Sequence, residues 1–332
     1  VLAGVFHHIS SDGWSKGILI REFMQLYSAY AKDEEIALPP LPLQYMDYAL
    51  WQREHLEGEV VDGQLSYWED TLKGLANLQL PTDRPRPKVQ SISGDTISFT
   101  LDRDLSEDIN SLSLREGTTV FMTLLAAFKV VLGHYSGQQD ICVGTPVANR
   151  TQRELEDIIG FFVNTLALRT KINENSSFQE LLREVKRTTL GAYDHQQVPF
   201  EKVVERVVKT RDMGISPLFQ VLFVLQNTPD AAKIEMDGIT ISTYEDQEHT
   251  TAKFDLTVTV NETDEGFSVS INYCTDLFKE ETIQRMALHY QKLLTAVMAA
   301  PSSKLSGLSM LSDRERLQLL EGFNDTDVDF PK

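Results

Sequence analysis

Two adjacent histidines and a nearby aspartate at the start of the chain are the residues best suited to acid–base chemistry. The stretch that holds them is His7-His8-Ile9-Ser10-Ser11-Asp12-Gly13. An imidazole, with an ordinary pKa of about 6.5, can accept a proton at neutral pH or hydrogen-bond a reacting group and aim it. Histidine and aspartate are also metal ligands. The pattern therefore indicates proton transfer, metal binding, or histidines that are merely structural.

The flanking elements should hold these side chains at a turn. The apolar run 1–6 predicts a buried strand, and apolar residues between 19 and 30 recur at the spacing of an amphipathic helix. Asp12 and Ser15 are good helix N-cap types, and Gly13 permits a backbone conformation that other residues avoid. We therefore expect the histidines on a strand-to-helix turn that faces a cleft.

Strand geometry narrows the roles of the two histidines. Successive side chains of a strand point to opposite faces, so at most one histidine could join Asp12 at a common ion. No Cys/His pair lies nearby to complete such a site, and we expect no metal. By the same reasoning, only one of the two can face the cleft.

Length and composition predict a large folded protein. The 332 residues, 42% of them hydrophobic, suffice for one large core or two smaller ones. A net charge of −18 disfavours binding to nucleic acid or anionic membranes. No apolar run approaches the roughly 20 residues that span a bilayer. Cys142 and Cys274, without a Cys-x-x-Cys pattern, indicate a reducing compartment, which we take to be the cytoplasm.

Hydrophobic periodicity predicts further elements beyond the first helix. Aromatic residues at 45, 48 and 51 recur at helical spacing and are assigned to packing. A helix is also expected at 64–75, and a proline-rich stretch at 80–87 breaks regular structure. Later helices are expected at 104–116, 118–134, 177–193 and 278–299, and strands at 96–101, 160–169, 218–225, 233–243, 254–260 and 266–274. Residues 140–150 should form a core strand that ends in a turn.

The histidine motif resembles the His-His-x-x-x-Asp-Gly signature of the condensation domains of nonribosomal peptide synthetases, within the chloramphenicol acetyltransferase-like superfamily. Residues 160–169 resemble the Gly-x-Phe-Val-Asn-Thr-x-x-x-Arg motif of the same family. Other matching stretches are 45–51, 80–87, 195–201 and 211–223. Gln197 stands where the family usually has Asp, and Gly214 where it usually has Ser. Motifs in the family's order over residues 7–223 are much harder to obtain by chance than any single one.

This resemblance implies an α/β fold of the α+β type, with two chloramphenicol acetyltransferase-like lobes in a V-shaped pseudo-dimer. Because the chain begins inside a predicted strand, we expect the first lobe to be truncated. Residues 1–90 should form the C-terminal part of the first lobe and residues 91–311 the second lobe. Residues 312–332 resemble the linker towards a following adenylation domain.

The implied reaction is amide-bond formation. An acceptor aminoacyl group on one carrier protein attacks the donor acyl or peptidyl thioester on another. Both arrive on phosphopantetheine arms, so upstream and downstream peptidyl carrier domains and an adjacent adenylation domain are the expected partners, and no directly bound cofactor is expected. The family pattern assigns the catalytic place to His8, as general base or as positioning group. It leaves supporting roles to His7, Asp12 and Gly13.

Two polar residues outside the histidine motif are expected to support the site. Asp12 lies too near a helix start to reach substrate easily, so a cation from the second lobe should hold it. Arg150, on the turn after a core strand, is the candidate for a bidentate pair. Alternatively, Arg150 stabilises its own turn. Asn164 interrupts an apolar strand and needs hydrogen-bond partners, which backbone groups alone could supply.

Other members of the same superfamily are alternative interpretations. An epimerisation domain shares the histidine motif and would move an α-proton. A catalytically silent module would recruit tailoring enzymes. The intact stretch 160–165 favours condensation over epimerisation, and the complete histidine motif disfavours a silent module. Cyclisation domains normally carry an Asp-rich motif instead.

Overall fold

The computed structural model describes residues 4–210, 212–226, 234–236, 239–241 and 251–324. The helices are α1 (Gly13–Ala31), α2 (Tyr45–His55), α3 (Glu59–Leu72), α4 (Arg103–Glu116), α5 (Val120–Ser136), α6 (Phe178–Asp194), α7 (Phe200–Val207), α8 (Glu280–Ala299) and α9 (Asp313–Leu320). The strands are β1 (Gly94–Leu101), β2 (Asp140–Val147), β3 (Asn164–Lys171), β4 (Val221–Gln226), β5 (Ile234–Met236), β6 (Ile239–Ile241), β7 (Leu256–Thr263) and β8 (Gly266–Cys274).

One mixed sheet organises the described residues, with strand order β1-β8-β7-β4-β2-β3. The pairs β1–β8, β7–β8 and β2–β3 are antiparallel, whereas β4 runs parallel to both β2 and β7. The α/β class is thus confirmed, and all six strands come from the segment 91–311. The strand predicted at 233–243 falls partly outside the described residues, and inside them it is the two-stranded ribbon β5–β6.

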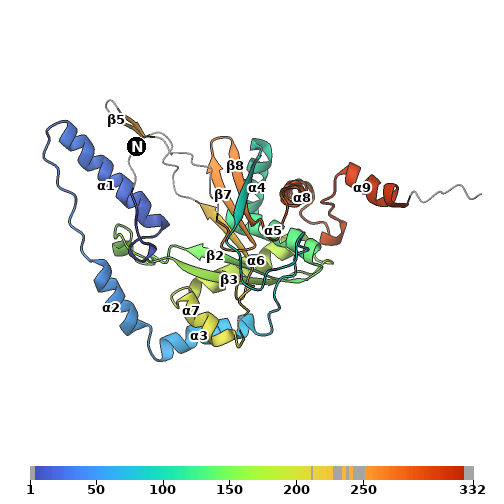
Figure 1. Ribbon diagram of the computed structural model, residues 1–332, viewed down its shortest axis with the longest axis horizontal. Helices are drawn as coiled ribbons and strands as arrows, with labels where there is room; N and C mark the ends of the chain where they lie inside the picture. The colour runs from blue at the N-terminus through green and yellow to red at the C-terminus, as the bar shows by residue number, and fades with distance from the viewer. Residues whose placement is uncertain (1–3, 211, 227–233, 237–238, 242–250, 325–332) are drawn as a thin grey trace, which may run out of the picture.

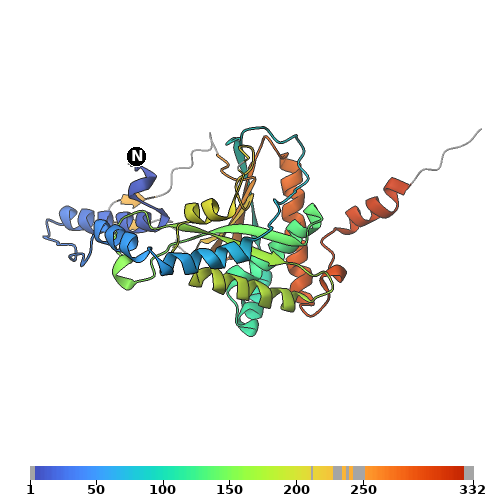
Figure 2. The ribbon, with the colours of Figure 1, turned by 90° about the horizontal axis from the view of Figure 1, so that it is seen from below.

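Helices α1 and α2 lie at one end of the molecule and α9 at the other, in both views (Figures 1 and 2). Helices α4, α6 and α8 pack against α5, which also contacts β2 and β4. The sequence of α5 is apolar over most of the helix surface and predicts this central place, and residues 121–132 are all buried in the structure. The Thr119 side chain caps the helix start and Gly137, in a left-handed conformation, ends it.

Lys129 is the exception in this apolar helix, since its side chain is fully buried. Its amine donates to the Leu168 carbonyl at 2.8 Å and to the Thr170 hydroxyl at 2.6 Å, both on β3. These partners are neutral. Burial therefore outweighs the nearby charges and lowers the pKa of Lys129 to about 7.

The proline-rich stretch after α3 is fastened along the second segment. The Asp83 carboxylate accepts the Lys279 N–H at 2.8 Å and the Thr282 hydroxyl at 3.0 Å, at the start of α8. Arg86 forms a two-pronged ion pair with Asp255, whose side chain is 4% exposed. These bonds attach the connector between α3 and β1 to the start of α8 and to Asp255.

The predicted strand at 1–6 is wrong over its described residues. Residues 4–7 have no regular structure, and Val5 and Phe6 are 98% and 60% exposed. A strand needs a neighbour for its N–H and C=O groups, and no described strand pairs with residues 4–7. The bonds that follow are local: Ser10 N–H donates to the His7 carbonyl at 3.0 Å.

Among the described residues, no single helix has the length and apolar character to cross a bilayer; α4 and α5 reach them only as a pair bent by 106°. Over the same residues, no three His, Cys, Asp or Glu side chains lie together where they could hold a metal ion.

The buried amine of Lys129 predicts a specific pH dependence of stability. The unfolded chain binds this proton up to a pH of about 10.4, whereas the folded chain releases it at about 7. The free energy of unfolding should therefore rise between about pH 7 and pH 10. Lys129→Met should remove that rise and stabilise the protein most at or below pH 7. Urea denaturation from pH 6 to 10 measures both, and an unchanged pH slope in the variant would show that Lys129 stays charged.

Candidate active site

The histidine motif forms a tight turn followed directly by α1. Residues His8–Ser10 make one turn of 3-10 helix, η1, with His7 as its N-cap. Asp12 then caps α1, where its carboxylate accepts the Ser15 N–H at 2.9 Å and the Ser15 hydroxyl at 2.7 Å. The histidines are therefore carried by a turn anchored at its far end by a buried acid.

The two exposed histidines make different hydrogen bonds through their Nδ1 atoms. The His7 Nδ1 accepts the Ile9 N–H at 3.1 Å, so its lone pair is engaged. The His8 Nδ1 lies 2.8 Å from the Ser11 carbonyl oxygen, which can only accept. In the neutral imidazole, Nδ1 of His8 must therefore carry the proton, and Nε2 has the lone pair. The expectation that a strand would point them to opposite faces is wrong, because His7 caps the 3-10 turn η1 and His8 begins it.

Asp12 and Arg150 form the predicted ion pair, with side chains 2% and 1% exposed. A single guanidinium nitrogen, Nη2, reaches both carboxylate oxygens at 3.2 and 3.4 Å, so the pair lacks the expected bidentate fork. The other nitrogen, Nη1, donates to the Leu155 and Ile158 carbonyls at 2.7 and 2.8 Å. Both interpretations of Arg150 are thus right: it holds its own turn and reaches Asp12.

The charge of Asp12 is stabilised despite its burial. Burial alone would raise the pKa of this carboxyl. Hydrogen bonds from Ser15 and from the Phe162 N–H (3.0 Å), together with the Arg150 charge, outweigh burial and hold the pKa below 3.8. The guanidinium also stacks over the Phe162 ring, 3.9 Å from its centroid. Asp12 is therefore an ionised anchor, not a proton donor.

Residues 160–162 are held to the motif by hydroxyl groups that the sequence patterns did not identify. The Ser15 hydroxyl accepts the Gly160 N–H at 3.1 Å, and its one proton is shared between the Asp12 carboxylate and the Gly160 carbonyl, which lies 2.9 Å away. The Tyr45 hydroxyl donates to the Phe161 carbonyl at 2.8 Å. The sequence pattern predicts only a capping type for Ser15 and packing for Tyr45. Neither role indicates a partner more than a hundred residues away.

A family model described as Condensation domain matches residues 1–320. The chain belongs to the condensation domain family. It is 51% identical over 324 residues to one of the linear gramicidin synthase proteins of Brevibacillus parabrevis, covering 97% of this chain and 6% of that protein. It is 45% identical to malpinin synthetase of Mortierella alpina, covering 96% of this chain and 4% of that protein. The chain thus spans a small fraction of these curated relatives.

Solved structures agree with this membership. A four-domain nonribosomal peptide synthetase bound to AMP and glycine matches with a TM-score of 0.82 and 26% identity, over 94% of this chain and 24% of that one. The X-domain from teicoplanin biosynthesis matches with a TM-score of 0.81 and 26% identity, over 92% of this chain and 70% of that one. These neighbours place the chain in the chloramphenicol acetyltransferase-like fold.

Asn164 of this condensation domain fastens a second stretch that matches the family pattern, 195–201. Its amide nitrogen donates to the Gln196 and Val198 carbonyls at 2.7 and 2.8 Å. Its amide oxygen accepts the N–H groups of Thr165 and Phe200 at 2.8 and 3.0 Å. All four partners are backbone groups, as the simpler interpretation held. Asn164 therefore positions a loop.

Two glycines and one glutamine of the motif stretches have distinct environments. Gly13 does not use a backbone conformation reserved for glycine, and an added Cβ there would meet nothing within 4 Å, so its predicted backbone role is wrong. Gly214 is required by a close approach instead, since a Cβ would lie 2.6 Å from the Pro87 carbonyl. Gln197 accepts a hydrogen bond from Gln64 of α3 at 3.3 Å.

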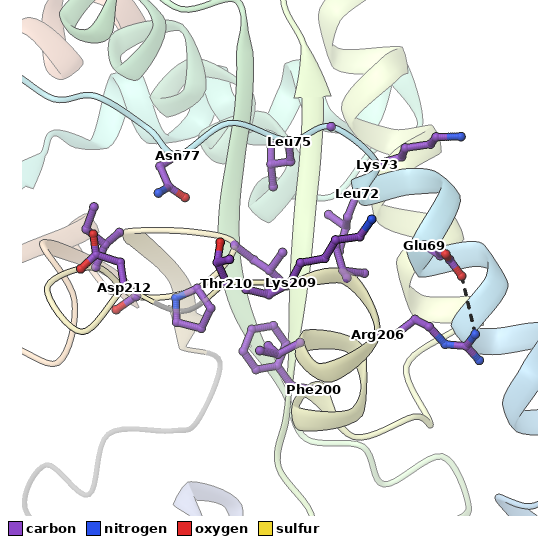
Figure 3. Close-up of a pocket in the computed structure, with 18 of the residues that line it drawn as sticks. Glu69, Leu72, Lys73, Leu75, Asn77, Phe200, Arg206, Lys209, Thr210 and Asp212 are labelled. Carbon is purple, nitrogen blue, oxygen red and sulfur yellow. Dashed lines mark ion pairs between the residues drawn. The ribbon is translucent and has the colours of Figure 1, made fainter.

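One pocket formed by the described residues lies away from the histidine motif and has a volume of about 830 Å³ (Figure 3). The end of α3, helix α7 and the loop after it form its walls, and an Arg206–Glu69 ion pair of 3.8 Å crosses its side. None of the predicted site residues lines it, although Phe200 and Asp212 from the later family motifs do. This pocket is therefore separate from the histidine motif.

Removing the Asp12 charge should cost much of the stability of this domain. Asp12→Asn keeps the side-chain shape but leaves Arg150 buried without its counter-charge, so we expect a loss of about 3–5 kcal/mol in the free energy of unfolding at pH 7. Because the folded-state pKa lies below 3.8, the contribution is complete above that pH. It fades as the pH falls through the folded value. Urea denaturation from pH 7 to pH 3 measures the effect.

An exposed ion pair between helix α1 and the stretch 150–162 provides a matched control. Arg21 and Asp157 pair at 2.6 Å with side chains 53% and 65% exposed, so Asp157→Asn should cost at most about 1 kcal/mol. The double variant of Asp12→Asn with Arg150→Met should be less destabilised than the sum of its parts. Equal, small costs for Asp12→Asn and Asp157→Asn would contradict the anchoring role of the buried pair.

Proposed function

We propose that this chain catalyses amide-bond formation between a donor acyl or peptidyl thioester and an acceptor amine, in nonribosomal peptide synthesis. Its family membership supports the reaction class. The observation that carries the proposal is the state of His8, whose Nδ1 is committed as a donor to the Ser11 carbonyl while Nε2 keeps a free lone pair. An imidazole in this tautomer can accept a proton from an attacking amine.

The reaction balances without a bound cofactor. The acceptor amine nitrogen bonds to the thioester carbonyl carbon, and the carbon–sulfur bond breaks. The proton that the amine gives up passes to Nε2 of His8 and then to the departing thiolate, which leaves as a thiol. Because a thioester is already activated, alignment of the amine and the carbonyl supplies much of the rate.

The partners follow from the same proposal. Both substrates are carried on phosphopantetheine arms of peptidyl carrier domains, one upstream and one downstream, and an adenylation domain follows residues 312–332. The position of α9, at the end of the molecule away from α1, suits a linker to a next domain (Figures 1 and 2). Residues 1–90 belong to the first lobe and residues 91–311 to the second. We place the protein in the cytoplasm, where the buried free thiols Cys142 and Cys274 would stay reduced.

The test compares the two histidines. His8→Ala should lower single-turnover amide formation between two loaded carriers by about 10²–10⁴-fold if Nε2 is a general base. The melting temperature should stay close to the parent's, because the side chain is exposed. His7→Ala should act mainly through stability, since His7 caps η1.

The control outcomes separate the alternatives. A smaller loss in His8→Ala that is independent of pH would assign His8 to positioning. Unchanged condensation in a folded His8→Ala variant would overturn the proposal and favour a silent recruitment module. Exchange of the α-proton on a single loaded carrier would instead favour an epimerisation domain.

A further inference from the structure

The Phe161 ring lies directly against His8. Their ring centroids are 5.1 Å apart and their planes stand at 89°, an edge-to-face contact. Position 161 is the variable position of the Gly-x-Phe-Val-Asn-Thr motif. The motif does not specify the residue at this position, so the contact with His8 has to be explained from its surroundings.

Side chains from the first segment fix the backbone on both sides of Phe161. Ser15 holds both the N–H and the carbonyl of Gly160, and the Asp12 carboxylate accepts the Phe162 N–H. The carbonyl of Phe161 itself accepts the Tyr45 hydroxyl. Three consecutive residues are thus hydrogen-bonded to the segment that carries His8. The Phe161 backbone cannot drift away from the imidazole.

Gly160 makes the Tyr45 contact possible. A Cβ at this position would lie 2.2 Å from Cδ2 and 2.7 Å from Cε2 of the Tyr45 ring. Any side chain would therefore push Tyr45 away and break its bond to Phe161. The Tyr45 ring also packs edge-on against Phe162, with centroids 5.2 Å apart. The glycine, the tyrosine and the ion pair act together on one short stretch.

Core packing does not explain where the Phe161 ring is. Phe161 is 40% exposed, so its ring gains only part of the stabilisation that full burial would give. The imidazole of His8 is held at one edge by its Nδ1 bond to the Ser11 carbonyl. Rotation about the Cβ–Cγ bond of a histidine has only a weak preference, and such a rotation would turn Nε2 away from the reacting amine. A ring packed against the imidazole limits that rotation.

We propose that Phe161 is a positioning residue for His8, which keeps the imidazole in the one orientation that directs Nε2 at the reacting amine. The inference rests on the proposed role of His8. Tyr45 and Gly160 support it by fixing the Phe161 backbone. The substrate need not touch Phe161 for this effect, so the consequence is a change in the rate of bond formation and not in acceptor binding.

The experiment measures single-turnover amide formation against acceptor concentration and pH, in the complete polypeptide that contains this chain. Phe161→Leu should lower the limiting rate by about 10-fold, the upper range for an edge-to-face pair, at an unchanged half-saturating concentration. Phe161→Tyr keeps the aromatic edge and should restore most of the rate. Phe23→Leu, at a similarly exposed (44%) phenylalanine of α1, should match the parent.

Two further variants keep the proposal falsifiable if the leucine variant folds poorly. Tyr45→Phe removes only the hydroxyl donated to Phe161, and it should lower the same limiting rate by about 3-fold. In a His8→Ala background, Phe161→Leu should have no additional effect, because its action passes through His8.

The outcomes separate this inference from the proposed function. If His8→Ala loses activity while Phe161→Leu keeps the parental rate, the positioning role is wrong and the proposed function stands. A raised half-saturating concentration at an unchanged limiting rate would make Phe161 a substrate contact and overturn the inference. An additional loss in the His8→Ala background would also overturn it. Parental activity in both single variants would overturn the inference and the proposed function together.

Discussion

The burial of one ion pair constrains the arrangement of the whole site. Two charges removed from water are costly unless their remaining hydrogen-bonding groups find partners. Backbone groups bind the Asp12 carboxylate and the Nη1 of Arg150, whereas the buried Nε of Arg150 has no hydrogen-bond partner among the described residues. The first segment can therefore not slide along the stretch 150–162 without exposing an unpaired charge. The turn that carries the histidines begins four residues before this anchor and inherits its position.

The fold was predictable where the sequence signal is local. Helix α5 follows from a run of apolar residues with a threonine cap and a terminal glycine, all of which lie within one window. The strand predicted at 1–6 failed because a strand exists only with a neighbour, and pairing is a long-range property that composition does not contain. Lys129 shows the reverse case: its burial depends on carbonyl and hydroxyl partners some forty residues along the chain.

The candidate site was predictable where physics leaves few choices. An acid held away from solvent requires a cation, so the sequence predicts the pairing of Asp12 with Arg150. Hydroxyl groups are less constrained, because Ser15 and Tyr45 can serve caps, packing or solvent equally well. Glycine was the least predictable residue type. Gly13 looked special and is not, whereas Gly160 matters because a tyrosine ring from a distant helix occupies the space of its Cβ.

The hydrogen bonds of the two histidines explain why the motif contains both of them. His7 uses its Nδ1 lone pair to cap η1, and that turn places the Ser11 carbonyl under the Nδ1 of His8. One imidazole thus builds the turn, and the other keeps a free Nε2 because of it. Since aminolysis of a thioester gains most from alignment, a scaffold that fixes the tautomer and direction of one exposed imidazole meets the main demand of the reaction. The buried ion pair, the Tyr45 hydroxyl and the Phe161 ring then all act on the same quantity, which is the direction of Nε2.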